Sequence, residues 1–188
     1  SEVKVLGIKW NKILDTFGVT ADITQPKILT KRKLLAYINA TFDVLGWTGP
    51  WMISSKLIFG QVCKDKYTWD EALPEEICKQ WHTYTQALGS HPTVTVPRTV
   101  RTQPGSTFKL FGFADASKNG ICAAIYAVEL DQLGNHIAQN LLVAKTRVAP
   151  LDHSIPRLEL IAAQTLAKLQ STVNTTLSSD SIVENYYW

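Results

Sequence analysis

Hydrophobic and polar positions divide the chain into three blocks, and the first block, residues 1–25, has the pattern of strands. Residues 3–10 are rich in β-branched and aromatic side chains, and a polar turn near residue 12 separates them from Phe17 and Val19. This pattern predicts a β-hairpin. Because an isolated hairpin is barely stable in water, we expect it to need a partner strand, normally one that precedes the first residue.

The second block, residues 26–91, has the spacing of helices. Thr30 is a suitable N-cap, and apolar residues follow it at helical intervals. The pattern stops at residues 46–50, resumes to about residue 64, and begins again at Pro74, which suits a first helical turn. We therefore predict three helices, the first and third with the apolar stripes Leu34, Leu35, Ile38 and Phe42, and Ile77, Trp81, Tyr84 and Leu88.

The third block, residues 108–188, follows a Pro-containing linker at residues 92–107. Its pattern predicts three strands, a helix and a further strand, and Asn119-Gly120 is a turn signal between the first two strands. The expected ranges are 108–115, 121–130, 136–145, 155–173 and 183–188. The apolar stripe expected for the helix is Leu158, Ile161, Thr165 and Leu169. The chain as a whole is therefore predicted to be α+β.

Composition narrows the class of protein. The 188 residues are 45% hydrophobic and 19% charged, as in a globular protein. No apolar run is long enough to span a membrane, and the first ten residues lack the layout of a signal peptide. The three cysteines have no zinc-site spacing and are best explained as small core residues. We expect an intracellular protein, in the cytoplasm or the nucleus, with no membrane partner.

Positive charge is concentrated in the first half of the chain. Residues 1–101 hold 13 of the 19 Lys and Arg, and Lys27, Lys31, Arg32 and Lys33 form a cluster without an acidic residue. Such a cluster can neutralise phosphates of a nucleic acid. It is also typical of an ordinary solvated helix start, so the pattern by itself leaves both interpretations open.

Two carboxylates carry the candidate chemistry. Asp115 ends the apolar strand of the third block, and Glu159 lies in what we expect to be the first turn of its helix. Strand, strand, strand, helix, strand is the opening order of an RNase H fold, whose acidic residues hold two divalent ions for phosphodiester hydrolysis. Mg²⁺ prefers such oxygen ligands. Alternatively, Asp115 caps the turn toward Asn119 and Glu159 simply favours the positive end of its helix.

Motifs throughout the chain resemble Bel/Pao-type retrotransposon polyproteins. The resemblance begins with Val-Lys-Val-Leu-Gly-Ile-Lys-Trp-Asn at residues 3–11 and continues through Phe-Asp-Val-Leu-Gly at 42–46 and Trp-Asp-Glu-Ala-Leu-Pro-Glu-Glu at 69–76. Gly-Phe-Ala-Asp-Ala-Ser at 112–117, Ala-Lys-Thr-Arg-Val-Ala-Pro at 144–150 and Ile-Pro-Arg-Leu-Glu-Leu at 155–160 extend it. The motifs occur in order over nearly the whole chain.

The resemblance implies the end of a reverse transcriptase followed by the first part of RNase H. Residues 1–25 would be a primer-grip-like hairpin ending the polymerase palm, 26–91 a helical thumb, 92–107 a connection, and 108–188 the incomplete RNase H-like domain with three antiparallel strands, a helix and the start of a fourth strand. The implied ligand is an RNA/DNA hybrid or a template–primer duplex. Asp115 and Glu159 would be catalytic and Mg²⁺-binding, and the nucleic-acid contacts would come from Trp10, Lys27, Lys31, Arg32, Lys33, Ser117, Lys145 and Arg147.

The chain departs from the family pattern at two places. The catalytic aspartates of the polymerase would precede the first residue, and a third RNase H carboxylate would follow directly after Tyr186-Tyr187-Trp188. Asp180 resembles that residue superficially, but it sits in a polar loop and we reject it. We therefore expect weak or absent Mg²⁺ binding and feeble or no hydrolysis by this chain, and whether it is an enzyme stays open.

Such a truncated sheet would leave an apolar surface and a strand edge bare. We expect another chain, or a second copy of this one, to cover it. The alternative function is that of a repurposed retroelement remnant, which acts as a protein-binding scaffold without catalysis. The aromatic residues serve either function, because they fill cores and anchor interfaces alike.

Overall fold

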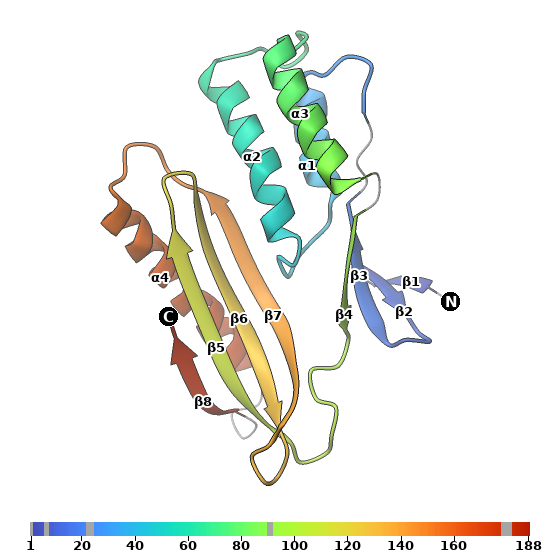
Figure 1. The fold of residues 1–188 in the computed structure, drawn as a ribbon, viewed down its shortest axis with the longest axis vertical. Helices are drawn as coiled ribbons and strands as arrows, with labels where there is room; N and C mark the ends of the chain where they lie inside the picture. Colours follow the sequence, from blue (N-terminus) through green and yellow to red (C-terminus); the bar gives the residue numbers. More distant parts are fainter. Residues whose placement is uncertain (1, 6–7, 22–24, 90–91, 178–181) are drawn as a thin grey trace.

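The computed structural model describes residues 2–5, 8–21, 25–89, 92–177 and 182–188. In these ranges the chain forms four helices and two four-stranded sheets, so the predicted α+β class is confirmed (Figure 1). Asp180 lies outside the described residues. In the part of the chain that the structure describes, no helix is both long and apolar enough to cross a bilayer.

The small sheet contains the predicted hairpin, but Glu2–Val5 and Ile8–Asn11 are two paired strands where we expected one, and the fourth strand was not expected either. Strands β1 (Glu2–Val5), β2 (Ile8–Asn11), β3 (Thr16–Thr20) and β4 (Thr93–Pro97) pair antiparallel in that order. The strand β4 lies in the segment that we predicted to be a linker. It pairs with β3 because Thr-Val-Thr-Val alternates in the manner of a strand, with Val94 and Val96 half-buried. The hairpin thus gains a partner strand on the β3 side, and a partner strand ahead of the first residue stays a prediction.

The three predicted helices form and pack on one another. They are α1 (Lys31–Ala40), α2 (Gly49–Lys64) and α3 (Glu75–Leu88), with a common core that includes Leu34, Ile38, Val62, Ile77 and Trp81. The hydroxyl of Thr30 accepts a hydrogen bond from the amide of Lys33, as an N-cap should. Phe42 does not extend the apolar stripe, because α1 ends at Ala40 and Phe42 is half exposed.

The large sheet has the strand order β7-β6-β5-β8 and carries one long helix on one face. Its strands are β5 (Thr107–Ala116), β6 (Gly120–Leu130), β7 (His136–Val148) and β8 (Ile182–Tyr187), and β8 runs parallel to β5. The helix α4 (Ile155–Thr176) packs on β5 and β6 (Figure 1). Its buried row is Leu158, Ala162, Thr165, Leu166, Gln170 and Val173, so the predicted Ile161 and Leu169 are only half-buried at its border.

A loop between α1 and α2 joins the helical bundle to the edge of the large sheet. The amide of Ala144 on β7 donates to the carbonyl of Leu45 at 2.8 Å, and the Trp47 indole donates to the carbonyl of Leu142 at 3.3 Å. Gly46 has φ +76°, and a Cβ at this position would lie 1.9 Å from the carbonyl oxygen of Ala144. Only glycine allows this approach. The loop thereby covers part of a strand edge that would otherwise be bare.

A buried carboxylate fixes the segment that leads from β4 to β5. Glu129 is 1% exposed, and it accepts hydrogen bonds from the amide and hydroxyl of Thr102, the amide of Gln103 and the hydroxyl of Ser106. Burial raises the pKa of Glu129, but the hydrogen bonds from Ser106, Thr102 and Gln103 together outweigh burial and leave the pKa below its usual value. The carboxylate is therefore held in its charged form.

Candidate functional site

Asp115 stands one residue before the end of β5, and its carboxylate is exposed. Its neighbours Ala114 and Ala116 pack against the cluster that contains Leu158 and Ala162 of α4. Since side chains alternate along a strand, Asp115 leaves the sheet on the face opposite α4. There it lines a hollow of about 380 Å³ together with residues of α2, among them Ile53.

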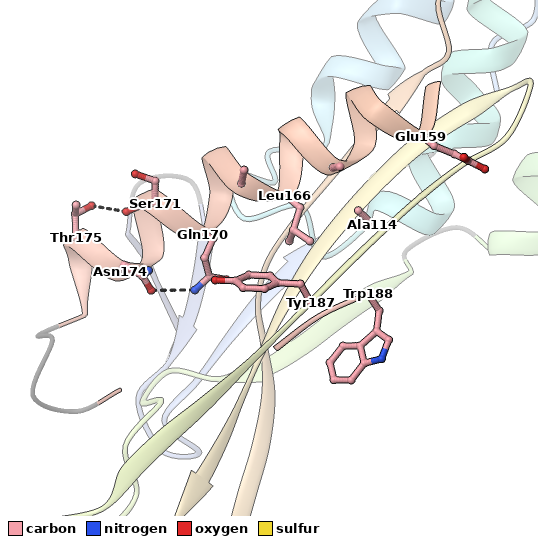
Figure 2. A pocket seen from close by; sticks show the side chains of 11 residues that line it. Ala114, Glu159, Leu166, Gln170, Ser171, Asn174, Thr175, Tyr187 and Trp188 are labelled. Atoms are coloured by element: carbon pink, nitrogen blue, oxygen red, sulfur yellow. Dashed lines mark hydrogen bonds between the residues drawn. The ribbon is translucent and has the colours of Figure 1, made fainter. Parts of the chain in front are cut away.

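Glu159 is the fifth residue of α4, so it lies just beyond the first turn in which we expected it. The attraction of a carboxylate to a helix N-terminus fades after the first turn, which weakens the purely structural explanation of Glu159. Glu159 is exposed and lines a hollow of about 690 Å³ beside α4, which Ala114 also lines (Figure 2). The two candidate carboxylates thus come from one corner of the fold but line separate hollows, with the end of β5 between them.

The side chain of Ser117, and not that of Asp115, caps the turn toward Asn119. The Ser117 hydroxyl accepts hydrogen bonds from the amides of Asn119 and Gly120, at 3.3 and 3.1 Å. Among the described residues, Asp115 accepts a hydrogen bond only from the neighbouring amide of Ala116, at 2.8 Å. The turn is therefore capped by Ser117, and the role of turn cap does not explain the presence of Asp115.

Two exposed cations lie at the same end of the sheet. Lys145 and Arg147 flank Thr146 on β7, and Thr146 pairs through Cys122 of β6 with Asp115 of β5. At the usual strand spacing, the two cations lie about 10 Å across the sheet from Asp115. Because side chains alternate along a strand, Thr146 shares the face of Asp115, and the two cations point to the opposite face, that of α4 and Glu159.

Three cations of the basic cluster make contacts within the molecule, although Arg32 and Lys33 stay exposed. The Lys31 ammonium donates to the carbonyl of Tyr67 at 3.2 Å, and the Lys33 ammonium donates to the carbonyl of Ile28 at 3.0 Å. Arg32 forms a bidentate ion pair with Asp70, at 2.7 and 2.9 Å. Their hydrogen bond raises the pKa of Arg32 and lowers that of Asp70.

The last member of the cluster, Lys27, is exposed. The charge available from this segment is therefore smaller than the count of four positive residues suggested.

Trp10 belongs to a clamp that sequence reasoning missed. Its indole donates to the carboxylate of Asp15 at 3.0 Å, and the Arg98 guanidinium lies 5.5 Å from the ring centroid. Arg98, just after β4, makes a bidentate ion pair with Asp15, at 2.6 and 2.9 Å. Residues 83 positions apart come together here only because β4 joins β3, so no local pattern could have indicated the clamp.

The residues present fit only part of a two-ion site. Asp115 and Glu159 are oxygen donors of the kind that Mg²⁺ prefers. Within the described ranges, no group of three or more His, Cys, Asp or Glu side chains is arranged as a metal site. The two carboxylates can therefore contribute to ion binding at the corner, without forming a complete ligand set between them.

Comparisons with known proteins place the chain in a family. A search of curated proteins found no match. Among solved structures, the chain is similar to the foamy viral protease-reverse transcriptase in complex with double-stranded DNA, with 14% identity and a TM-score of 0.47 over 99% of this chain. The chain spans 30% of that protein. A family model described as Pao retrotransposon-like RNaseH-like domain matches residues 30–188. The chain therefore belongs to the Pao retrotransposon-like RNaseH-like domain family, as the Bel/Pao-type motifs predicted.

Proposed function

We propose that this chain binds an RNA/DNA hybrid or template–primer duplex as part of a retroelement reverse transcriptase with RNase H. The observation that carries the proposal is the corner at which the end of β5 meets α4, since Asp115, Glu159 and the exposed cations Lys145 and Arg147 all come from this end of the sheet, the cations on the face of Glu159. Family membership supports this assignment. Contacts from cations to phosphates hold a duplex in register without reading its sequence.

We assign Asp115 and Glu159 as ligands of a divalent ion such as Mg²⁺. When bound, the ion would stabilise charge that develops on a phosphodiester. The two carboxylates would orient it from the two sides of the strand end. Because they line separate hollows on the two faces of the strand, we expect ion binding by this chain to be weak.

The division of the chain follows from the same proposal. Residues 1–25 would form the primer-grip-like hairpin, 26–91 the thumb, 92–107 the connection and 108–188 the RNase H-like domain. The clamp of Trp10, Asp15 and Arg98 supports a positioning role for the hairpin, because it holds the indole against the end of β4. Of the bundle cations, Lys27 is the one we assign to a phosphate contact, and Lys31, Arg32 and Lys33 would contribute less. Ser117 would contact the hybrid with its exposed turn.

The test is a hybrid-binding assay at two salt concentrations, together with hydrolysis in Mg²⁺ and in Mn²⁺. We expect affinity for a labelled hybrid to fall steeply with salt, as when phosphate contacts release counterions. Hydrolysis should be feeble or absent. No hybrid binding at low salt would refute the proposal. Robust hydrolysis that Asp115→Asn abolishes would show that the two carboxylates suffice, contrary to our expectation.

A second candidate function is that of a protein-binding scaffold, favoured by the hollow beside α4. This hollow is largely apolar, and apolar surface of this kind is typical of protein interaction sites. Sedimentation at micromolar concentration discriminates, because association would support the scaffold and a clean monomer would count against it.

A further inference from the structure

The helical bundle meets the large sheet along β7, at the α1–α2 loop (residues 41–48) and at the start of α2 (Figure 1). The carbonyl of Leu45 accepts a hydrogen bond from the amide of Ala144 at 2.8 Å. The buried indole of Trp47 donates to the carbonyl of Leu142 at 3.3 Å. Two parts of one chain that meet over a narrow contact normally move relative to each other. The build of the loop therefore decides whether the bundle keeps one position on the sheet.

The loop is fixed to α2 by one carboxylate. Asp43 accepts hydrogen bonds from the amide of Trp47 at 3.1 Å and from the amide and the hydroxyl of Thr48, both at 2.6 Å. Thr48 is 1% exposed and directly precedes α2. Hydrogen bonds to a charged acceptor are stronger than those between neutral groups. The loop therefore keeps its orientation relative to the helix, and the two form one unit.

Two glycines let this unit approach β7 closely. A Cβ at Gly46, whose φ is +76°, would lie 1.9 Å from the carbonyl oxygen of Ala144. A Cβ at Gly49 would lie 2.4 Å from the hydroxyl of Thr146. Groups packed at such distances leave no room for a shift along the strand. The bundle is therefore seated on residues 144–146 in one position.

The bundle and the sheet each carry cations that we assigned above to phosphate contacts. Lys27 precedes α1, whereas Lys145 and Arg147 lie on β7 beside the loop. The ten residues of α1, about 15 Å of helix, separate the loop from the end of the bundle near Lys27. A duplex that reaches both regions gains the second contact without a second association, provided that the geometry lets both form at once.

We propose that the α1–α2 loop is a positioning element that holds the bundle on β7, so that one duplex contacts Lys27 and the sheet corner together. Its positioning residues are Asp43, Gly46 and Trp47. The inference rests on the proposed function for the ligand, and it adds residues that control binding without touching the duplex. Loosening the loop should remove the contribution of Lys27 to affinity and leave that of the corner.

The first test follows the position of the bundle without any nucleic acid. Gly46→Ala should push the loop away from β7, so that the Ala144 amide loses its acceptor and exchanges its hydrogen several-fold faster, as measured by NMR. The matched control is Gly89→Ala, because Gly89 has a φ of +74° but a Cβ there meets nothing within 4 Å. Trp47→Phe, which loses the hydrogen bond to Leu142 but keeps a ring, should act in the same direction more weakly. Equal exchange in Gly46→Ala and in the control would overturn the inference.

The second test is a double-mutant cycle on hybrid affinity. Lys27→Ala should weaken hybrid binding several-fold in the wild-type chain, and the same change should have little effect in the Gly46→Ala chain. A loop with a purely structural role would lower stability and leave the effect of Lys27→Ala unchanged. Equal effects in the two backgrounds would therefore overturn the inference. No effect of Lys27→Ala in the wild type would also overturn it, while hybrid binding through the corner would stand.

A disulfide bond provides the rescue. A Cβ at Gly49 would lie 3.4 Å from the Cβ of Thr146, close to the separation of about 3.5–4.5 Å found in disulfides. Gly49→Cys with Thr146→Cys should therefore fasten α2 to β7 when oxidised, and Cys122→Ser removes the thiol that neighbours residue 146. In the Gly46→Ala chain, oxidation should restore the effect of Lys27→Ala, and reduction should abolish it again. An oxidised chain that shows no restored effect would overturn the inference.

The outcomes separate this inference from the proposed function. Absence of hybrid binding at low salt in every chain would overturn both. The results named for the exchange rate, the double-mutant cycle and the disulfide overturn the inference alone, because hybrid binding by the wild type persists in each of them.

Discussion

The helical bundle and the large sheet use their polar residues differently. In the bundle, Lys31 and Lys33 donate to backbone carbonyls and Arg32 pairs with Asp70, so the polar groups satisfy one another around a closed core. At the corner of the sheet, Asp115, Glu159, Lys145 and Arg147 are exposed. The bundle has the denser positive sequence, yet three of its four cations are already engaged in contacts within the molecule. A count of charges along a sequence therefore does not indicate which charges can reach a ligand.

The largest effect is expected in the bundle core. Leu34 is fully buried, so Leu34→Ala should lower the free energy of unfolding by about 2–5 kcal/mol through lost burial and a cavity. Denaturant unfolding measures this change. Hybrid affinity of the folded variant should stay at the wild-type value, because the core makes no contact with ligand. A loss of affinity in the folded variant would show that the packing of the core positions the ligand contacts.

The second-largest effect on stability is expected at Glu129, which fixes the segment between β4 and β5. Glu129→Gln should lower the free energy of unfolding by about 2 kcal/mol at neutral pH, since a buried charged acceptor of four hydrogen bonds is lost. The folded-state pKa of Glu129 is depressed, so its contribution is present above the unfolded value and declines as the pH falls through the folded one. The difference between wild type and variant should therefore shrink below about pH 4.5. A constant difference across pH would contradict this.

A smaller effect tests the contrast between the two basic regions directly. Arg147→Ala should weaken hybrid binding several-fold and reduce the salt slope by about one, as expected for one lost phosphate contact. Arg32→Ala is the matched control, since Arg32 is also exposed but is paired with Asp70. Binding titrations at two salt concentrations measure the hybrid affinity and the salt slope of each variant. Equal losses in the two variants would remove the distinction between the regions.

The smallest effect is expected when the ion pair between Arg32 and Asp70 in the bundle is removed. Asp70→Asn leaves the Arg32 guanidinium without its ion-pair partner, while the exposed pair itself contributes little to stability. The thermal midpoint should therefore stay close to that of the wild type. Hybrid affinity should rise slightly, because a free guanidinium becomes available to phosphate. A fall in affinity would indicate that the Arg32–Asp70 pair orients a ligand contact.

The sequence by itself determined the elements and the family. Alternation and helical spacing located the helices and the strands of the large sheet, Thr30 was found as a cap, and the motifs indicated the Pao family. These signals are local, since capping and amphipathic periodicity act within a few residues of the same segment. The position of Asp115 at a strand end was equally readable from the sequence.

Only the tertiary structure decided which distant residues meet. The pairing of β4 with β3, the Trp10–Asp15–Arg98 clamp, the approach of Gly46 to Ala144 and the stacking of Phe111 on Trp188 depend on contacts between segments far apart in the chain. The same holds for the engagement of Lys31, Arg32 and Lys33. Hydrogen bonds, ion pairs and ring stacking form between groups that are close in space, and sequence spacing predicts such closeness only within a helix or along a strand.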